Sequence, residues 1–398
     1  MQLQRAWLFC LLARLVGGAV NETCSAAHRR DFSLAGQVRR ALGGAATKEA
    51  LATRLIDDHF DYLRAGADAS IKADDAAGVH ALVARVAALG LVPVLEVRSD
   101  AFNTSALCAF LRHGVPALRA APNVKAYVLL SLGAAAHASP FHPAILRALK
   151  RGCGAGEAQL RRVLLEPKLR RWFVSQHFPA VDSSWSDRPK EAHADVGDTR
   201  RALHWVMHPK LHHVPLGVPR IFSKNFQREA AWLDASQRAF DGCETRIDSD
   251  PSIYVNFKPR RYREAVVATL RARLGAALPN MYVGTQRVRS RAAVDTRDYV
   301  GAMFSHKFVL SPPGSGIDCY RHWEALLCGA VPIVEYNPLV VELLAGLPAI
   351  IVRDWADVDA KFLRAKYDQL AATTFDFERL TTAFWRAELQ RTKGPQGA

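Results

Sequence analysis

Short apolar runs alternate with amphipathic helical stretches along most of the chain, and this pattern is typical of an α/β protein. Because helices and strands alternate, we expect parallel sheets that are covered by helices. Buried strands are predicted at residues 91–97, 124–130, 172–178, 253–257, 281–283, 308–310, 330–334 and 349–352. Helices are predicted at residues 27–63, 74–89, 105–111, 262–274, 296–305, 338–344, 357–371 and 375–390.

The chain has 398 residues, which is long enough for two domains of ordinary size. Residues 150–165 interrupt the pattern with glycine and arginine, and the polar residues 182–198 indicate a long loop. Residues 221–251 indicate a linker. We therefore expect a first Rossmann-like domain at 27–220 and a second at 252–374, facing each other across a cleft.

The most informative stretch is residues 307–335, whose pattern predicts a strand, a glycine-rich loop, a short helix and a second strand. The apolar run at 308–310 is ended by the prolines and glycines of 311–316. Asp318 is the expected N-cap of a helix that starts at the next residue, and Gly329 is expected to end that helix. The unit is a βαβ motif.

The junction between this loop and its helix carries the candidate chemistry. Gly314 and Gly316 allow a ligand to approach the backbone closely, and Ser315 lies between them. The free amides and the dipole of a helix N-terminus form an anion site. Arg321 supplies a fork-shaped cation that suits phosphate, and Glu324, on the same helix face, can accept hydrogen bonds from ribose hydroxyls. Together they indicate a nucleotide-sugar site.

Each of these assignments has an alternative. Arg321 and Glu324 could instead form a surface ion pair, which would add little to stability. A basic cluster follows the strand at 253–257, and its member Arg263 is the candidate for a second phosphate contact. The alternative for Arg263 is a solvated basic helix start.

The run KFVLSPPGSGIDCYRHWEALLCGAVPIVE resembles the donor-binding segment of the exostosin-like glycosyltransferases, including their ribitol xylosyltransferase-like branch. Residues 253–257 resemble the first strand of the same domain. The resemblance implies a GT-B fold, in which the helix at 375–390 packs back on the first domain. It also implies transfer of a sugar from a nucleotide-sugar donor, UDP-linked by analogy with this family, to a glycan or glycoprotein acceptor. Arg321 would then contact the diphosphate and Glu324 the ribose.

The resemblance further implies that helix amides and basic residues stabilise the leaving diphosphate, so no metal or other cofactor is expected. The letters of a metal-binding DxD motif occur at 248–250, but they lie in the linker. An inverting transfer would need a general base from the first domain. His137, His177 and Asp182 are candidates, and the sequence does not choose among them or between retention and inversion.

The formal net charge is +15 and the isoelectric point is about 9.7. A net positive charge favours anionic partners, namely nucleotide sugars, acidic glycans, phospholipid surfaces or nucleic acid. The charge alone does not distinguish among these classes. A second hypothesis is therefore a catalytically silent relative that holds an anionic glycan, although the presence of Arg321 and Glu324 argues against it. A nucleic-acid partner is not expected, because no groove-reading motif is present.

Residues 1–20 resemble a secretory signal, with a short positive start, an apolar run and small residues for cleavage. Arg14 interrupts the apolar run, which is shorter than the roughly 20 residues that span a bilayer. The sequons at Asn21 and Asn103 agree with this route. We expect the lumen of the Golgi or the endoplasmic reticulum, with membrane association through residues 1–20 as the alternative to cleavage.

Six cysteines lie beyond the signal and allow fifteen disulfide pairings. Cys319 and Cys328 sit at opposite ends of one predicted helix and are expected to remain thiols. No metal site is expected. His204 and His208 have helical spacing, but Pro209 argues against a helix there. The acidic residues at 57–61 suit one polar helix face.

Overall fold

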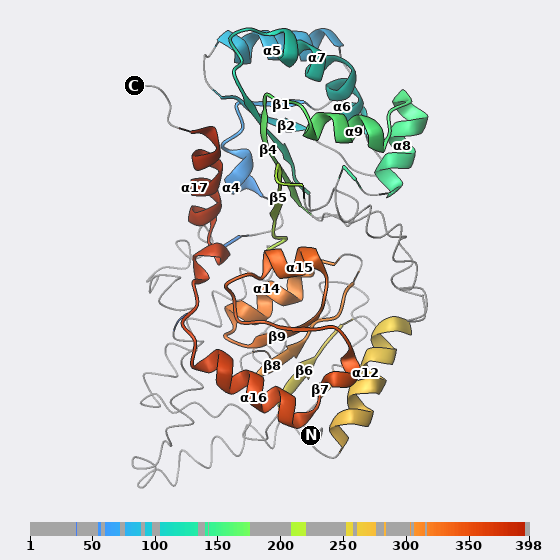
Figure 1. Ribbon diagram of the computed structural model, residues 1–398, viewed down its shortest axis with the longest axis vertical. Coiled ribbons are helices and arrows are strands. Elements are labelled where there is room, and N and C mark those ends of the chain that lie inside the picture. Colours follow the sequence, from blue (N-terminus) through green and yellow to red (C-terminus); the bar gives the residue numbers. More distant parts are fainter. Residues whose placement is uncertain are drawn as a thin grey trace.

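The computed structural model describes residues 37, 55–56, 60–71, 76–88, 92–97, 104–133, 140–141, 143–175, 208–219, 252–257, 261–275, 282–283, 303, 306–314 and 317–394. This part is an α/β structure with two parallel sheets, one above the other (Figure 1). We call the parts built on them the N-terminal lobe (β1–β5) and the C-terminal lobe (β6–β10). Outside the described residues lie residues 1–20, Asn21, Asn103, residues 182–198, the linker 221–251 and nearly all of the predicted helix 296–305.

The sheet of the N-terminal lobe has its strands in sequential order, β1-β2-β3-β4-β5, and all of them are parallel. Because parallel crossovers are right-handed, a sequential order puts every connecting helix on the same face of the sheet. These helices share one apolar core with that face. The strands are Ala69–Ile71, Val94–Val97, Tyr127–Ser131, Leu169–Ser175 and Leu211–Val214. The helices are α5 (Ala76–Ala88), α6 (Ser105–Ala109), η1 (Phe110–Gly114), α7 (Val115–Ala120), α8 (Pro143–Cys153) and α9 (Glu157–Leu164).

In this lobe the structure differs from the prediction made from the sequence. Strand β1 was not predicted, because three residues carry too little periodicity to stand out. The expected interruption at 150–165 is instead the junction of α8 and α9. Gly154 has a φ of 67° just beyond α8, and the Gly156 N–H donates to Gln159 Oε1 at the start of α9. The glycines therefore mark helix boundaries and do not break the lobe.

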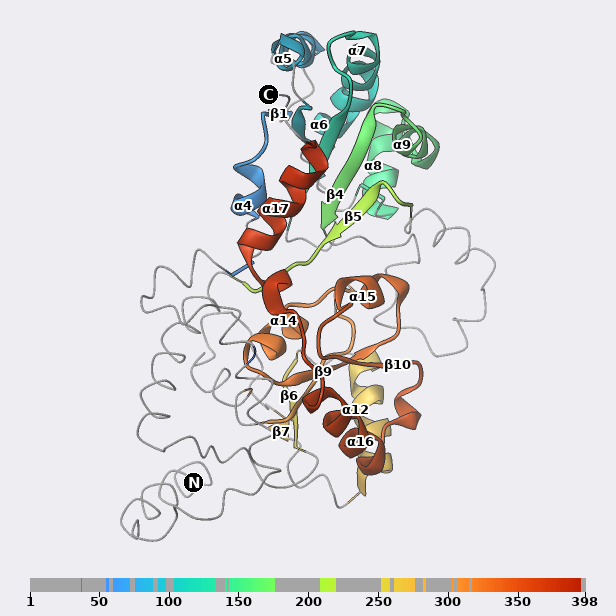
Figure 2. The same cartoon turned by 60° about the vertical axis from the view of Figure 1, so that its left-hand side comes forward.

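The second face of this sheet is covered by α4 (Asp61–Arg64) and by the last helix, α17 (Thr382–Lys393). Figures 1 and 2 both show α17 beside α4 along the N-terminal lobe. Trp385 and Leu389 are buried in the same cluster as Val128 of β3. At the helix end, Lys393 Nζ lies 3.4 Å from Asp68. The end of the chain thus completes the core of its first lobe.

The final helix differs from the continuous one predicted at 375–390. A 3-10 turn (Phe377–Leu380) comes first, and α17 begins only after Thr381. Thr381 is extended, pairs with Leu55 in an isolated antiparallel bridge, and accepts a hydrogen bond on Oγ1 from the Phe384 N–H. The helix is interrupted because Thr381 serves both as its N-cap and as a partner of a distant segment.

The sheet of the C-terminal lobe has the order β10-β9-β8-β6-β7, again entirely parallel. Strand β7, which follows β6 in the chain, lies on one side of β6 at the edge of the sheet. The next strand, β8, lies on the other side of β6, and β9 and β10 continue to the opposite edge, so the order reverses between β6 and β8. The strands are Ile253–Val255, Tyr282–Val283, Phe308–Leu310, Val331–Glu335 and Ile350–Val352. The helices are α12 (Arg261–Leu274), α14 (Tyr320–Leu327), α15 (Pro338–Leu343), η5 (Trp355–Asp357) and α16 (Ala360–Ala371).

Helices cover both faces of this second sheet. Leu270 of α12 and Leu363 of α16 belong to a core on one face. Trp323 of α14 and Leu343 of α15 belong to the cluster on the other face, which continues into the N-terminal lobe. The predicted βαβ unit at 307–335 is present, and Gly329 has the positive φ, 66°, expected of a residue that ends a helix.

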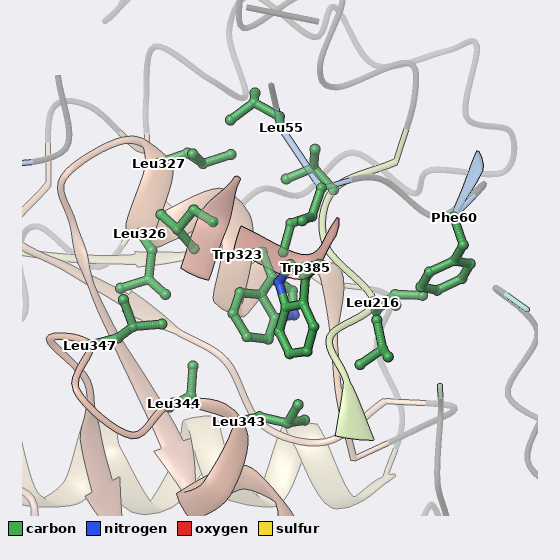
Figure 3. Packing of buried hydrophobic residues seen from close by; sticks show 14 of the residues in the cluster. Leu55, Phe60, Leu216, Trp323, Leu326, Leu327, Leu343, Leu344, Leu347 and Trp385 are labelled. Carbon is green, nitrogen blue, oxygen red and sulfur yellow. The ribbon is translucent and has the colours of Figure 1, made fainter. Parts of the chain in front are cut away.

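One apolar cluster joins the two lobes (Figure 3). It includes Trp323 of the C-terminal lobe, Trp385 of α17, and Leu216, which follows β5. The three crossing segments are hydrogen-bonded in series: Ile56 N to Leu380 O at 3.1 Å, and Val218 N to Ile56 O at 3.1 Å. The lobes therefore meet through a packed and paired junction.

One disulfide in the described part, Cys108–Cys153, ties α6 to the end of α8. Cys319 and Cys328 are in the thiol form, as predicted, while Cys24 and Cys243 lie outside the described residues. Among the described helices, none combines the length and the apolar character that crossing a bilayer would require.

We predict that Trp385→Ala lowers the free energy of unfolding by about 3–5 kcal/mol, because it empties a large site in the cluster between α17 and the sheet. Phe384→Ala at the neighbouring half-buried position is the control and should cost less. Chemical denaturation measures both. Equal losses would mean that α17 does not depend on Trp385 for its attachment.

Candidate functional site

The candidate site lies at the carboxyl ends of β6 and β8, where the strand order reverses. Open α/β sheets bind ligands at such a point, because the loops leaving the two strands diverge there. Asn256 and Phe257 follow β6, and Ser311 to Gly314 follow β8. The N-terminus of α14 comes next along the chain.

Arg321, in the first turn of α14, is fixed to the end of β6. Its Nε donates to the Asn256 carbonyl at 3.0 Å, and its guanidinium lies 5.2 Å from the centroid of the Phe257 ring. Its Nη1 is buried and has no hydrogen-bond partner among the described residues. A buried guanidinium nitrogen without a partner is costly, so this position favours an acceptor such as a phosphate oxygen.

Arg263, in the first turn of α12, contacts the loop that follows β8. It is buried, its Nε donates to the Pro313 carbonyl at 3.0 Å, and its guanidinium also lies 5.2 Å from the Phe257 ring centroid. Two cations from different helices therefore share one aromatic ring. A Cβ at Gly314 would lie 2.5 Å from Arg263 Nη2, so glycine leaves the space that this guanidinium occupies.

The groups beside the two arginines are held neutral. His322 is buried, with Nδ1 at 2.7 Å from Ser311 Oγ and Nε2 at 3.2 Å from the Ile317 carbonyl. Burial lowers the pKa of His322 to about 3, and the positive charges of Arg321 and Arg263 add to this effect. Burial raises the pKa of the Cys319 thiol, which the same two charges oppose. Among the described residues of the site, the positive charge is thus carried by Arg321 and Arg263.

Glu324 lies one turn further along α14 and is 5% exposed. Within the described part of the chain Arg321 forms no ion pair with it and instead contacts Asn256 and Phe257. The surface ion pair weighed above is therefore wrong. Ser315 and Gly316, the rest of the predicted loop site, lie outside the described residues.

Asp318 does not cap α14 as expected. The N-cap is Cys319, without a side-chain cap, and the Asp318 carboxylate faces the other lobe. It accepts hydrogen bonds from Leu216 N at 2.6 Å and from Trp323 Nε1 at 2.7 Å. Burial raises its pKa to about 7, although these bonds act in the opposite direction. The capping rule is local and could not reveal a partner 102 residues earlier in the chain.

The remaining predicted groups are not brought to this site by the described residues. The candidate bases His137, His177 and Asp182 lie outside the described part, as do Asp248, Asp250 and His204. His208 precedes β5, where its Nδ1 accepts a hydrogen bond from Lys210 N. In the described ranges no group of three or more His, Cys, Asp or Glu side chains could hold a metal ion.

Phe257 and Asn256 are the members of the site that the sequence did not reveal. Their only signal is position, directly after a buried strand at the start of the second lobe. No protein-family model matches the chain, and no curated protein matches its sequence. The functional argument therefore depends on the geometry of the site.

We predict that Gly314→Ala weakens binding of pyrophosphate by about tenfold, since the new Cβ displaces the guanidinium of Arg263. The clash involves the end of a flexible side chain, so the free energy of unfolding should change by less than about 1 kcal/mol. Gly152→Ala in α8, which meets only ordinary contacts, is the matched control for calorimetric titration. Undiminished pyrophosphate binding in the Gly314 variant would contradict the assignment of Arg263.

We predict that His322 contributes to acid sensitivity. Its folded pKa is far below its ordinary value of 6.5, so its stabilising contribution is present above pH 6.5 and is lost as the pH falls toward 3. In His322→Gln the slope of unfolding free energy against pH should decrease by up to about 1.4 kcal/mol per pH unit in this range. His80→Gln, at an exposed position, is the control. Identical slopes in wild type and His322→Gln would contradict a neutral buried imidazole.

Proposed function

We propose that the protein is a glycosyltransferase that moves a sugar from a nucleotide-sugar donor, UDP-linked, to a glycan or glycoprotein acceptor. The observation that carries the proposal is the pair Arg321 and Arg263, which share the Phe257 ring at the reversal of strand order. A diphosphate would supply an acceptor oxygen for the buried Nη1 of Arg321, which has no partner among the described residues, and negative charge opposite two cations.

The chemistry of transfer needs such a site. The bond between the sugar C1 and the diphosphate oxygen breaks, the bond from C1 to the acceptor oxygen forms, and the acceptor hydroxyl loses its proton. Negative charge grows on the leaving diphosphate, and fixed cations stabilise it without reorganising. The first amides of α14 add the positive end of its dipole. These groups perform the role without a metal ion.

Glu324 is proposed to accept hydrogen bonds from the ribose hydroxyls. It is buried on α14, three residues beyond the cation that would hold the diphosphate. One helical turn is about 5.4 Å, which is close to the separation between a ribose and its diphosphate. A buried carboxylate at this position would favour a nucleoside over a free phosphate.

The N-terminal lobe is proposed to hold the acceptor. Two parallel sheets and a final helix that returns to the first lobe support a GT-B fold. If the reaction inverts the sugar configuration, the base is sought in this lobe, with His137, His177 and Asp182 as candidates. The disulfide Cys108–Cys153 supports an oxidising compartment, in keeping with the secretory pathway.

A second candidate is a silent relative that binds an acidic glycan. The same arginine pair and the net charge of +15 favour it, because both attract any anion. The difference lies at Glu324, whose carboxylate would repel a sulfate or uronate but suits ribose hydroxyls.

We predict that one nucleoside phosphate among UDP, GDP, CMP and ADP raises the melting temperature of the wild-type protein. At one hundred times its dissociation constant the ligand should add about 2.7 kcal/mol to the free energy of unfolding. Arg321→Ala and Glu324→Ala should lose most of this gain, because one removes the phosphate contact and the other the ribose contact. Arg271→Ala, exposed on the same helix as Arg263, is the control and should keep it.

Differential scanning fluorimetry measures these shifts. If no nucleotide in large excess stabilises the wild type while a sulfated polysaccharide does, the transferase proposal fails and the glycan-binding candidate replaces it. If a nucleotide stabilises wild type and Glu324→Ala equally, the ribose contact is wrong.

A further inference from the structure

Asp318 is a buried carboxylate at the junction of the two lobes, and the proposed transfer reaction does not use it. Its side chain is 4% exposed. One oxygen accepts from the backbone N–H of Leu216 in the N-terminal lobe, and the other accepts from the indole N–H of Trp323 in the C-terminal lobe. The carboxylate therefore bridges the lobes with both oxygens engaged.

The N-terminal partner of this bridge belongs to the chain crossings. Leu216 lies one residue before Gly217, whose φ is 68° and where a Cβ would lie 2.5 Å from the Ile56 carbonyl. Val218 donates to that carbonyl, and Ile56 in turn donates to Leu380. A change in the angle between the lobes must move these paired segments, and Asp318 is attached to them.

The C-terminal partner of the bridge belongs to the candidate anion site. Asp318 is followed at once by Cys319, the N-cap of α14, and three residues later by Arg321. The backbone from Asp318 to Arg321 is short and connects to a helix that Trp323 anchors in the interlobe cluster. Displacement of Asp318 would therefore shift the start of α14 and the guanidinium that it carries.

We infer that Asp318 is a positioning residue that couples the arrangement of the two lobes to the geometry of the candidate anion site. The coupling between the lobes and the start of α14 does not depend on which ligand the site binds. Its effect on nucleotide binding rests on the proposed function, and the two can be tested separately.

Burial, and not a neighbouring charge, is the main cause of the raised pKa of Asp318. On its own element the titratable residues are Cys319, Tyr320, Arg321, the neutral His322 and Glu324. Residues 215–218, which include its partner Leu216, carry no titratable side chain, and neither do residues 55–56, which pair with them, or Trp385 of α17. Arg379 is directed to the carbonyls of Glu342 and Ala345.

The sign of the pH effect follows from linkage. The pKa of Asp318 in the closed junction is raised to about 7 from an ordinary value of 3.8. Opening the junction would hydrate the carboxylate and return the pKa to its ordinary value, so protonation favours the closed state and ionisation favours opening. Between pH 6 and pH 8 the opening constant should rise by up to about tenfold, because it increases by about one decade for the single pH unit below 7 and levels off above pH 7, where both states are ionised.

The test is hydrogen–deuterium exchange of the full chain at pH 6 and pH 8, corrected for intrinsic rates, over peptides covering 211–219 and 319–328. In the wild type both peptides should lose protection together at pH 8, by up to about tenfold. Asp318→Asn should remove this pH dependence, because an amide does not titrate. It should also reduce protection in both peptides, since its NH2 group faces one of the two N–H donors.

Asp359→Asn is the matched control, because Asp359 likewise accepts a backbone N–H in the C-terminal lobe but lies at the start of α16. It should leave both peptides and their pH dependence unchanged. Equal wild-type protection at pH 6 and pH 8 would overturn the inference, and this measurement does not require the variant to fold. Loss of protection confined to 319–328 in Asp318→Asn would also overturn it.

A nucleotide titration separates this inference from the proposed function. If UDP binds the wild type, Asp318→Asn should bind it about tenfold more weakly and Asp359→Asn equally well. Equal affinity of the two variants would overturn the link between the junction and the site. If no nucleotide binds the wild type while the exchange pattern is as expected, the coupling stands and the transferase proposal fails.

Discussion

The sequential order of the N-terminal strands is the constraint on which the rest of the structure depends. Right-handed crossovers in a β1-β2-β3-β4-β5 sheet place all connecting helices on one face and leave the other apolar face uncovered. The chain covers it with α4 and with α17 from its far end. The last segment must therefore return past the C-terminal lobe, and this return pairs Thr381 with Leu55 and places Trp385 in the cluster that joins the lobes.

The two sheets differ in what they can bind for the same topological reason. The described strands of the N-terminal sheet contain no reversal of order, whereas the C-terminal sheet reverses between β6 and β8. Loops that leave neighbouring strands in opposite directions open a space at their carboxyl ends. Arg321, Arg263 and Phe257 gather at that point, each from a different segment. The proposed function accordingly puts the sugar donor in the C-terminal lobe.

The polar groups buried around the site divide into two kinds. His322 and Ser311 satisfy each other and stiffen the loop after β8 without adding charge. Asp318 is the opposite case, because its partners come from both lobes and its burial opposes its own ionisation. The charge of the candidate anion site thus depends on the arginines, whereas the attachment of its helix to the other lobe depends on Asp318.

The sequence by itself determined the elements whose signals are local. The strand at 308–310, the helix that follows and its end at Gly329 were predicted because apolar runs, turn residues and a helix-ending glycine act over a few positions. The same local reasoning singled out Arg321 and Arg263 as cations near one strand edge, and the structure places both over Phe257.

Only the tertiary structure decided which distant groups meet. The pairing of Cys108 with Cys153, the role of Phe257 as a shared platform, the break at Thr381 and the attachment of Asp318 to Leu216 all join positions far apart in sequence. No periodicity or capping rule encodes such contacts, because they depend on strand order and on the path of the final helix. Local sequence features therefore identified the candidate residues, whereas strand order and the path of the chain determine which distant residues they contact.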